Sequence, residues 1–144
     1  MIEFKQIEYN SPNYKKELEL RNIVLKIPLG LNIYELNLDF ERNDFHLGAF
    51  LNEKLIAALV LTKLDKEEIQ MRQVAVNETY QGKNIGKQLV VYSEEFLFQK
   101  GFSKIVLNAR KNVVPFYEKL GYCAVGEEFI EVNIPHFKME KIIR

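Results

Sequence analysis

The sequence predicts an α/β (α+β) fold in which a mixed, mostly antiparallel central sheet is flanked by helices. Three strand-like segments follow one another between residues 45 and 76 with short polar turns, which is typical of an antiparallel meander. From residue 84 onward, helical and strand patterns alternate, and such helix-linked strands indicate a parallel pair within the sheet. With 144 residues, 47% of them hydrophobic, we expect a single domain over residues 1–144.

The N-terminal third contains a strand, a helix and an irregular segment. Residues 2–7 alternate in the manner of a short strand. Ser11 is placed to cap a helix that has Pro12 in its first position and runs to about Lys26. Residues 27–43 show no clean period and predict an irregular excursion.

The rest of the chain divides into short strands and two further helices. Two apolar runs form a hairpin around a polar turn at residues 52–54. After it we expect a strand over 68–76, a helix over about 84–100, a strand over 103–108, a short helix over 113–120 and a strand over 122–125. Asn112 is placed to cap the short helix.

Charge and cysteine content exclude several classes of protein. Lys plus Arg and Asp plus Glu each total 20, so there is no basic field that would favour nucleic acid as a partner. Cys123 is the only cysteine, which excludes an internal disulfide; we expect it to be a buried small hydrophobe in a reducing compartment, the cytoplasm. The N-terminus lacks the apolar segment of a signal peptide, and we expect neither a membrane span nor a membrane partner.

Residues 74–87, VAVNETYQGKNIGK, contain the most informative pattern of the chain. A strand ends at Val76, and the small or permissive residues from Gln81 to Gly86 then lead directly into a helix. Backbone amides at such a junction can converge on a phosphate, and Lys83 and Lys87 add positive charge beside it. Taken alone, the pattern also fits a plain strand-to-helix connection.

The loop resembles the Q/R-x-x-G-x-G/A pyrophosphate loop of the GNAT superfamily of acyl-CoA N-acyltransferases. Gln81 and Gly86 occupy the first and last motif positions, and Asn84 stands where that family usually has glycine. Residues 108–110 and the segment FYEKLGY at 116–122 are similar to a second family segment, in which a tyrosine sits beside the thioester sulfur. The tail at 126–139 resembles the ending of the ElaA-like branch.

This resemblance implies a GNAT-like sheet with a splayed parallel strand pair that binds acetyl-CoA. The implied cofactor-binding residues come from the end of one strand, the loop after it and a neighbouring strand: Val74, Ala75, Val76, Gln81, Gly82, Lys83, Asn84, Ile85, Gly86, Lys87 and Asn108. Asparagine tolerates positive φ better than other non-glycine residues, so we expect the turn to survive at Asn84. No metal is expected.

Tyr117 is the residue to which the resemblance assigns chemistry. A departing thiolate needs a proton, and a phenol with an ordinary pKa of roughly 10 is still a donor at neutral pH. The alternative is that Tyr117 belongs to a core pair with Phe116. A backbone N–H near Val74 would meet the oxyanion, and we expect direct attack by a primary amine in a ternary complex.

The acceptor site and the general base stay open at this level. The candidates are acidic residues, histidines and one arginine that follow no triad or metal spacing: Glu41, His46, Arg72, Glu128, Glu131 and His136. Arg72 could orient a carboxylate on the acceptor or pair with a glutamate at the sheet surface. Each of the others also fits a solvated or structural role.

Two classes of function fit these observations. The first is an N-acetyltransferase that acts on a small-molecule or peptide amine. The second is a non-catalytic acyl-CoA-binding sensor or regulatory module built on the same loop. A homodimer is compatible with either function.

Overall fold

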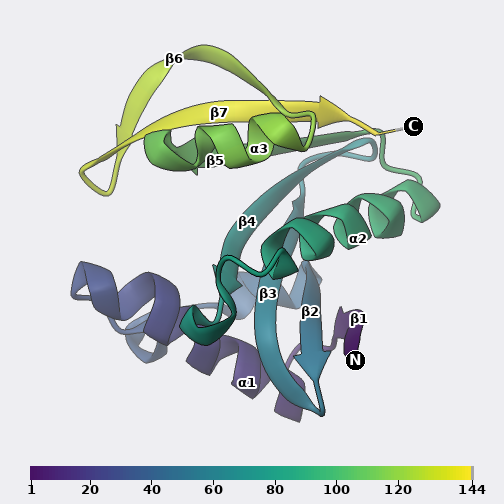
Figure 1. Cartoon of the computed structure of the whole chain (residues 1–144), viewed down its shortest axis with the longest axis vertical. Helices are drawn as coiled ribbons and strands as arrows, with labels where there is room; N and C mark the ends of the chain where they lie inside the picture. The colour runs from purple at the N-terminus through teal and green to yellow at the C-terminus, as the bar shows by residue number, and fades with distance from the viewer. Residues whose placement is uncertain (144) are drawn as a thin grey trace. The chain divides into compact units, whose positions relative to one another are not determined.

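The computed structural model describes residues 1–143 (Figure 1). Its helices and strands, in chain order, are β1 Ile2–Ile7, α1 Pro12–Arg21, β2 Phe45–Leu51, β3 Lys54–Lys63, β4 Glu68–Val76, α2 Ile85–Gln99, β5 Lys104–Arg110, α3 Val114–Lys119, β6 Cys123–Glu131 and β7 Ile134–Ile142. The strands follow the order β1-β2-β3-β4-β5-β7-β6. β4 and β5 are parallel, whereas β1 with β2, β2 with β3, β5 with β7 and β6 with β7 are antiparallel. This confirms the predicted mixed, mostly antiparallel sheet.

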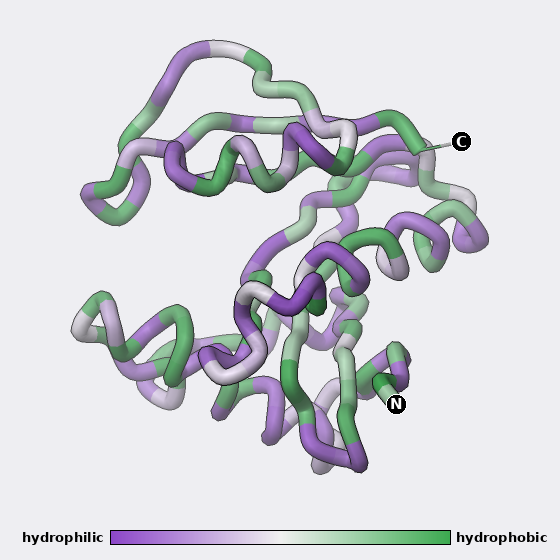
Figure 2. Tube along the Cα trace, viewed as in Figure 1, coloured by the Kyte–Doolittle hydropathy of each residue, from purple (hydrophilic) through white to green (hydrophobic). Residues whose placement is uncertain are grey.

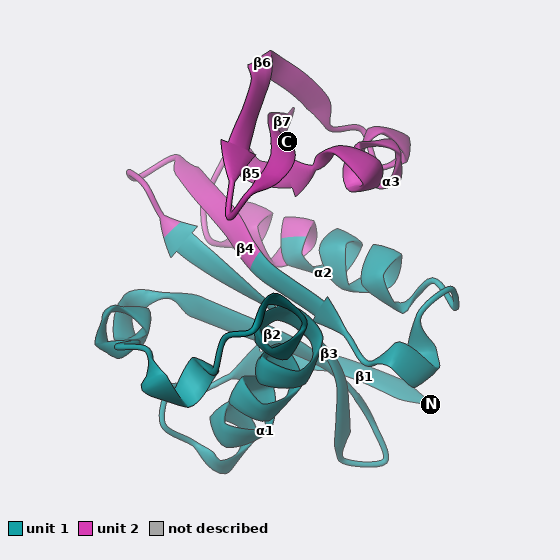
Figure 3. Cartoon of the chain, turned by 90° about the vertical axis from the view of Figure 1, so that its left-hand side faces the viewer, with its two compact units in different colours: residues 1–62, 73–93 teal, residues 63–72, 94–144 magenta. Residues whose placement is uncertain are grey.

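The chain divides into two compact units (Figure 3). The first comprises residues 1–62 and 73–93, and the second comprises residues 63–72 and those from Glu94 onward. β4 and α2 each contribute residues to both units.

In the first unit, α1 packs on one face of the strands. The α1 residues Tyr14 and Leu20 join Ile7, Phe50 and Ala58 of β1, β2 and β3 in one buried cluster. Figure 2 shows hydrophobic residues along β2 and β3 and hydrophilic residues in the turn between these strands. This pattern gives the antiparallel strands an apolar face on which the helix can pack.

The start of α1 is as predicted, but its end differs. Ser11 Oγ accepts a hydrogen bond from Tyr14 N at 3.2 Å, with Pro12 in the first turn. The α-helix stops at Arg21 and continues as a π-helical turn over Asn22–Lys26. The excursion after it consists of 3₁₀ turns at Ile27–Leu29, Ile33–Glu35 and Asp39–Asn43.

The β2–β3 turn is tighter than expected. Asn52 and Glu53 both have positive φ, of 50° and 68°, and Lys54 already belongs to β3. Two such residues form the two-residue turn whose twist matches that of paired strands. The hairpin prediction is confirmed, with a turn one residue shorter.

In the second unit, β5, β7 and β6 form an antiparallel group joined to the start of β4. The parallel register pairs Glu68, Ile69 and Gln70 with Lys104, Ile105 and Val106. The parallel pairing covers only the first three residues of β4. A splayed strand pair is one in which the pairing stops in this way and the strands separate beyond it. Within residues 1–143, no helix combines the length and apolar character that crossing a membrane requires.

Two local predictions in this unit are wrong. Asn112 does not cap α3, because it lies inside a 3₁₀ turn over Lys111–Val113 and the helix begins only at Val114, without a side-chain cap. Cys123 is exposed and not buried, because it opens β6, which lies last in the strand order.

Candidate active site

The end of β4 presents main-chain groups beside a break in the strand. Gln73 has a φ of 54°, which interrupts the regular pleat just before Val74. Ala75 is buried, whereas Val74 and Val76 are half-buried. The Val76 carbonyl accepts a hydrogen bond from Gln81 Nε2 at 3.0 Å. Because a carbonyl oxygen has two lone pairs, a second donor can still approach Val76.

The loop after β4 is a series of turns. Asn77 Oδ1 accepts from Thr79 N at 2.9 Å and opens a 3₁₀ turn over Glu78–Tyr80. Gly82 and Asn84 then both have positive φ, of 78° and 65°. The value at Asn84 agrees with the expectation that asparagine adopts there a conformation for which glycine is the usual residue.

The start of α2 leaves backbone amides available to an anion. The helical ladder begins with Gln88 N, which donates to Asn84 O at 3.0 Å. The amides of Ile85, Gly86 and Lys87 precede that bond, as in the first turn of any α-helix. These amides and the positive end of the helix dipole favour a phosphate group. We call residues 81–87 the phosphate cradle; all of them lie in the first unit.

Tyr117 lies in α3, in the second unit, among aromatic rings. Its ring meets those of Phe116 and Tyr122 edge-on, with centroids 5.0 and 5.6 Å apart. Burial raises the pKa of its hydroxyl to about 12. A phenol with this pKa keeps its proton at neutral pH and can donate it. The core-pair alternative therefore describes the ring and does not exclude an acid role for the hydroxyl.

Two further candidates lie on strands of the second unit. Asn108 is exposed in β5, where it is paired in register with Lys138. Arg72 is half-buried in β4, directly before the break at Gln73.

Glu41 is buried in an ion-pair cluster of the first unit. Arg21 Nη1 and Nη2 lie 2.8 and 2.7 Å from Glu41 Oε1 and Oε2, and Tyr14 OH donates to Oε1 at 2.8 Å. Burial by itself would raise the pKa of the Glu41 carboxyl, but the hydrogen bond and charge of Arg21 outweigh it and lower that pKa. An anion stabilised in this way is a poor proton acceptor, so the geometry opposes a role as general base.

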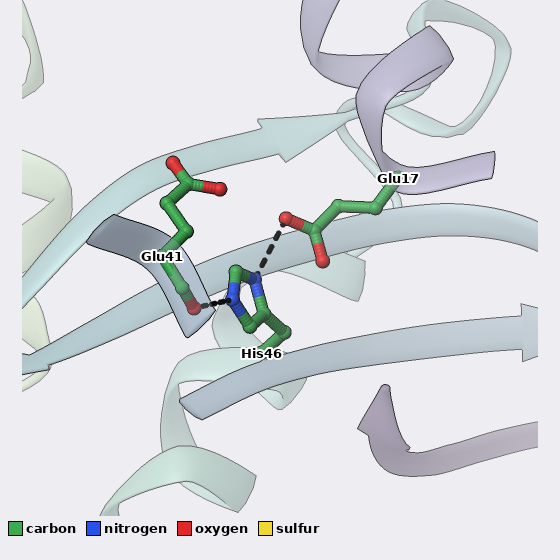
Figure 4. A group of neighbouring side chains, drawn as sticks. All are labelled: Glu17, Glu41 and His46. Carbon is green, nitrogen blue, oxygen red and sulfur yellow. Dashed lines mark hydrogen bonds and ion pairs between the residues drawn. The ribbon is translucent and has the colours of Figure 1, made fainter. Parts of the chain in front are cut away.

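His46 belongs to the same cluster (Figure 4). Its Nδ1 lies 3.0 Å from Glu17 Oε2, and its Nε2 lies 3.0 Å from the Glu41 carbonyl oxygen. His46 is 1% exposed. With both ring nitrogens engaged, it has no free lone pair to accept a proton, and the geometry also opposes its role as base.

The three side chains in Figure 4 are close enough to be considered as a metal site. The ligand atoms of Glu17, Glu41 and His46 lie within 4.8 Å of one another. Arg21 already bonds both carboxylates, with Nη1 at 2.8 Å from Glu17 Oε2. A cation would have to displace this guanidinium, so the donor set fits an ion-pair cluster better than a metal site.

The remaining base candidates lie on the β6–β7 hairpin. Glu128 pairs with Lys111 at 3.1 Å. His136 is buried, and its Nδ1 lies 2.7 Å from the Ile134 carbonyl oxygen, while its Nε2 lies 3.5 Å from Glu131 Oε2. Because the carbonyl oxygen can only accept, Nδ1 carries the hydrogen of this bond, and Nε2 faces the Glu131 carboxylate at a longer distance than any hydrogen bond of His46.

Sequence reasoning missed the partners that fix these side chains. Glu17 and Arg21 are four residues apart on α1, a spacing that usually indicates an exposed acid–base pair, yet their side chains are 0% and 2% exposed. Glu94 and Lys141 form a 2.9 Å ion pair across 47 residues of sequence, and no local pattern indicates it.

A comparison with known proteins identifies the family to which this fold and loop belong. A family model described as "Acetyltransferase (GNAT) domain" matches residues 33–143. YitI of Bacillus subtilis (strain 168), an uncharacterized N-acetyltransferase, is 26% identical over 148 residues, which cover 96% of this chain and 97% of that protein. The chain belongs to the GNAT acetyltransferase family, which confirms the resemblance found in the sequence.

Solved structures show the same fold. Escherichia coli ElaA is similar with a TM-score of 0.85 at 23% identity, covering 98% of this chain and 99% of that one. A GNAT family acetyltransferase from Elizabethkingia anophelis with acetyl-CoA bound has a TM-score of 0.74 at 19% identity, covering 98% and 97%. At these identities the likeness shows the fold alone.

Proposed function

We propose that this chain is an N-acetyltransferase that moves the acetyl group of acetyl-CoA to a primary amine of a small molecule or peptide. The observation that carries the proposal is the phosphate cradle. In it, Gly82 and Asn84 have positive φ directly before a helix, and the first backbone amides of that helix come before its first backbone hydrogen bond. Membership of the GNAT family supports the same assignment. So does the fold shared with a structure that holds acetyl-CoA.

Each part of acetyl-CoA has a proposed partner. The pyrophosphate binds the amides of residues 82–87, and the charges of Lys83 and Lys87 lie nearby in sequence. The amides of the pantetheine arm pair with the main chain of Val74–Val76, beyond the break at Gln73. Asn108 remains a proposed contact because of its place in the family pattern.

The reaction proceeds by direct attack in a ternary complex. The amine nitrogen adds to the thioester carbonyl carbon, and the Val74 N–H stabilises the resulting oxyanion. The carbon–sulfur bond then breaks, the thiolate takes a proton from Tyr117, and a base takes a proton from the amine. Proton exchange with solvent then returns a proton to the Tyr117 phenolate and removes one from the base, which restores both groups. Holding amine and thioester together corresponds to effective molarities on the order of 10⁵ M or more.

We propose His136 as the base, assisted by Glu131. The hydrogen bond from Nδ1 to the Ile134 carbonyl oxygen fixes the ring, and Nε2, 3.5 Å from Glu131 Oε2, is the nitrogen that would take the proton. Glu128 is the second candidate, although it already pairs with Lys111. Arg72 is the candidate for orienting a carboxylate on the acceptor, and an ion pair with a glutamate at the sheet surface is its alternative role.

The alternative function is a sensor that binds acyl-CoA without turnover. The cradle serves either function, because phosphate binding needs no catalytic group. Calorimetry with coenzyme A and acetyl-CoA tests the binding that both functions share, and absence of affinity for either ligand overturns both. Release of coenzyme A, followed with a thiol reagent over a panel of amines, separates enzyme from sensor.

Tyr117→Phe tests the acid role, with Tyr92→Phe as its control. Tyr92 stacks on Phe4 with ring centroids 5.7 Å apart, so its variant also loses one hydroxyl and keeps one ring. We expect Tyr117→Phe to lower kcat by about 10²-fold while the acetyl-CoA Kd is unchanged, since general-acid catalysis contributes on that order. A kcat equal to that of the control excludes the acid role.

A further inference from the structure

α3 is held at its carboxyl end by a side chain from β7. Lys141 Nζ donates to the Leu120 carbonyl oxygen at 2.7 Å, directly after the last residue of the helix. The last carbonyls of a helix lack partners within it, and an ammonium group there satisfies one of them and opposes the negative end of the dipole. In a helix of six residues, this single contact restrains a large part of the element.

Lys141 is itself fixed by two other residues. Its Nζ lies 2.9 Å from Glu94 Oε1 and 5.6 Å from the centroid of the Tyr122 ring. Tyr122 OH donates to the second oxygen of Glu94 at 2.8 Å. The side chains of Lys141 and Glu94 are 26% and 14% exposed, so the ion pair is partly shielded from solvent and stronger than a surface pair.

This network reaches Tyr117 through Tyr122. Tyr122 N donates to the Tyr117 carbonyl oxygen at 3.0 Å. The two rings also pack edge-on, at an interplanar angle of 74°. Both the backbone and the ring of Tyr117 therefore contact a residue whose hydroxyl is bonded to Glu94. All of these residues lie in the second unit.

We infer that Lys141, together with Glu94, is a positioning residue for acyl transfer, because it holds Leu120 and Tyr122 and thereby sets the direction of the Tyr117 hydroxyl. The inference rests on the proposed role of Tyr117 as the acid. A proton donor must lie within hydrogen-bond reach of its acceptor, and a misplacement of about 1 Å can lower a rate by about 10²-fold. Lys141 itself need not contact substrate.

A second ion pair in the chain serves as a control for the loss of stability that removing any ion pair could cause. Lys104 and Glu140 form an ion pair of the same length, 2.9 Å, between β5 and β7, with both side chains 30% exposed. Glu140 neighbours Lys141 in the sequence. Lys104→Met therefore removes a comparable pair from the same unit without touching α3.

The first experiment combines Lys141→Met, Lys141→Arg and Lys104→Met with Tyr117→Phe. Coenzyme A release is measured with the most reactive amine of the panel, and thermal unfolding is followed in parallel. We expect Lys141→Met to lower kcat on the order of ten-fold with little change in the KM for acetyl-CoA. Lys141→Arg should keep most of the wild-type kcat. Lys104→Met should have no effect on kcat. In the Tyr117→Phe background, Lys141→Met should cause no further loss.

Equal losses in both backgrounds overturn the inference, because Lys141 then acts independently of Tyr117. If Lys141→Met does not fold, Glu94→Gln replaces it, both alone and in combination with Tyr117→Phe. Glutamine keeps the size of the side chain and removes the charge that holds Lys141.

A second experiment needs no acceptor. Carbon-13 NMR of the full chain labelled at tyrosine Cζ, with coenzyme A as the probe, reports on the Tyr117 phenol, whose signal is assigned from Tyr117→Phe. Lys141→Met should shift this signal, Lys141→Arg should shift it less, and Lys104→Met should leave it in place. If Lys141→Met shifts the signal but Tyr117→Phe has a normal kcat, Lys141 positions the Tyr117 ring and Tyr117 is not the acid. A Tyr117 signal unmoved by Lys141→Met overturns the inference.

Discussion

His46 Nδ1 lies 3.0 Å from Glu17 Oε2, and the hydrogen bond and charge of this carboxylate raise the pKa of the ring. The other nitrogen, Nε2, lies 3.0 Å from the Glu41 carbonyl oxygen. Because a carboxylate and a carbonyl oxygen can only accept, both nitrogens donate in the imidazolium form, and this geometry favours that form. With Arg21 as the second cation, two carboxylates and two cations balance their charges in this cluster.

Stability should therefore decrease as the pH rises through the folded-state pKa of His46. Burial by itself would lower this pKa, but the hydrogen bond and charge of Glu17 outweigh it and raise it. A raised folded-state pKa adds stability that is fully present below the unfolded value of about 6.5 and is lost as the pH rises through the folded value. Urea unfolding from about pH 5.5 to about pH 9 should show the free-energy difference between wild type and His46→Gln shrinking with pH. A difference independent of pH would contradict the imidazolium.

Removing Arg21 should cost more than removing any exposed cation. Arg21→Met leaves the Glu41 carboxylate buried without its cation and with only the Tyr14 hydroxyl as a side-chain donor, and breaking a buried ion pair in this way costs about 3–5 kcal/mol. Lys104→Met, which removes a partly exposed pair, should cost at most about 1 kcal/mol. Urea unfolding measures both. Adding Glu41→Gln to Arg21→Met should recover part of the loss; no recovery would show that lost packing dominates.

The sequence predicted those elements whose stability depends on neighbouring residues. Ser11 and Pro12 start a helix through one side-chain hydrogen bond and one preset φ, and both act within a few residues. β4 was predicted with its observed bounds because its ends coincide with polar turns. The positive φ at Asn84 was also accessible, since it follows from the tolerance of asparagine.

Sequence reasoning failed where contacts between residues distant in the sequence determine the surroundings of a side chain. Glu41 looked like a candidate base, and only the approach of Arg21, 20 residues away, makes it a buried structural anion. Cys123 looked like a core residue, and only the strand order places it on a strand with a single neighbour. The positive φ at Gln73 has no sequence signal, because glutamine rarely adopts it.

The conformation of Asn84 should control affinity for coenzyme A. Asn84→Gly accepts the observed φ of 65° and should keep the affinity, whereas Asn84→Val places a β-branched residue in the left-handed region. The strain of about 1–2 kcal/mol should weaken binding about ten-fold, as measured by calorimetry. Asn133→Val is the control, because Asn133 has a similar φ of 62° in the β6–β7 turn, outside the phosphate cradle. Equal affinities in Asn84→Val and Asn133→Val would remove the cradle from the binding site.

The pH dependence of kcat should show no loss of the Tyr117 proton in the usual range for a phenol. Burial raises the pKa of this hydroxyl to about 12, so it remains protonated where an exposed tyrosine, with a pKa of about 10, would ionise. Between about pH 6 and about pH 10, wild type and Tyr117→Phe should therefore differ in kcat by a constant factor. An alkaline decline centred near pH 10 in wild type, and absent in Tyr117→Phe, would show that the acid is more exposed during turnover than its 7% exposure in this structure implies.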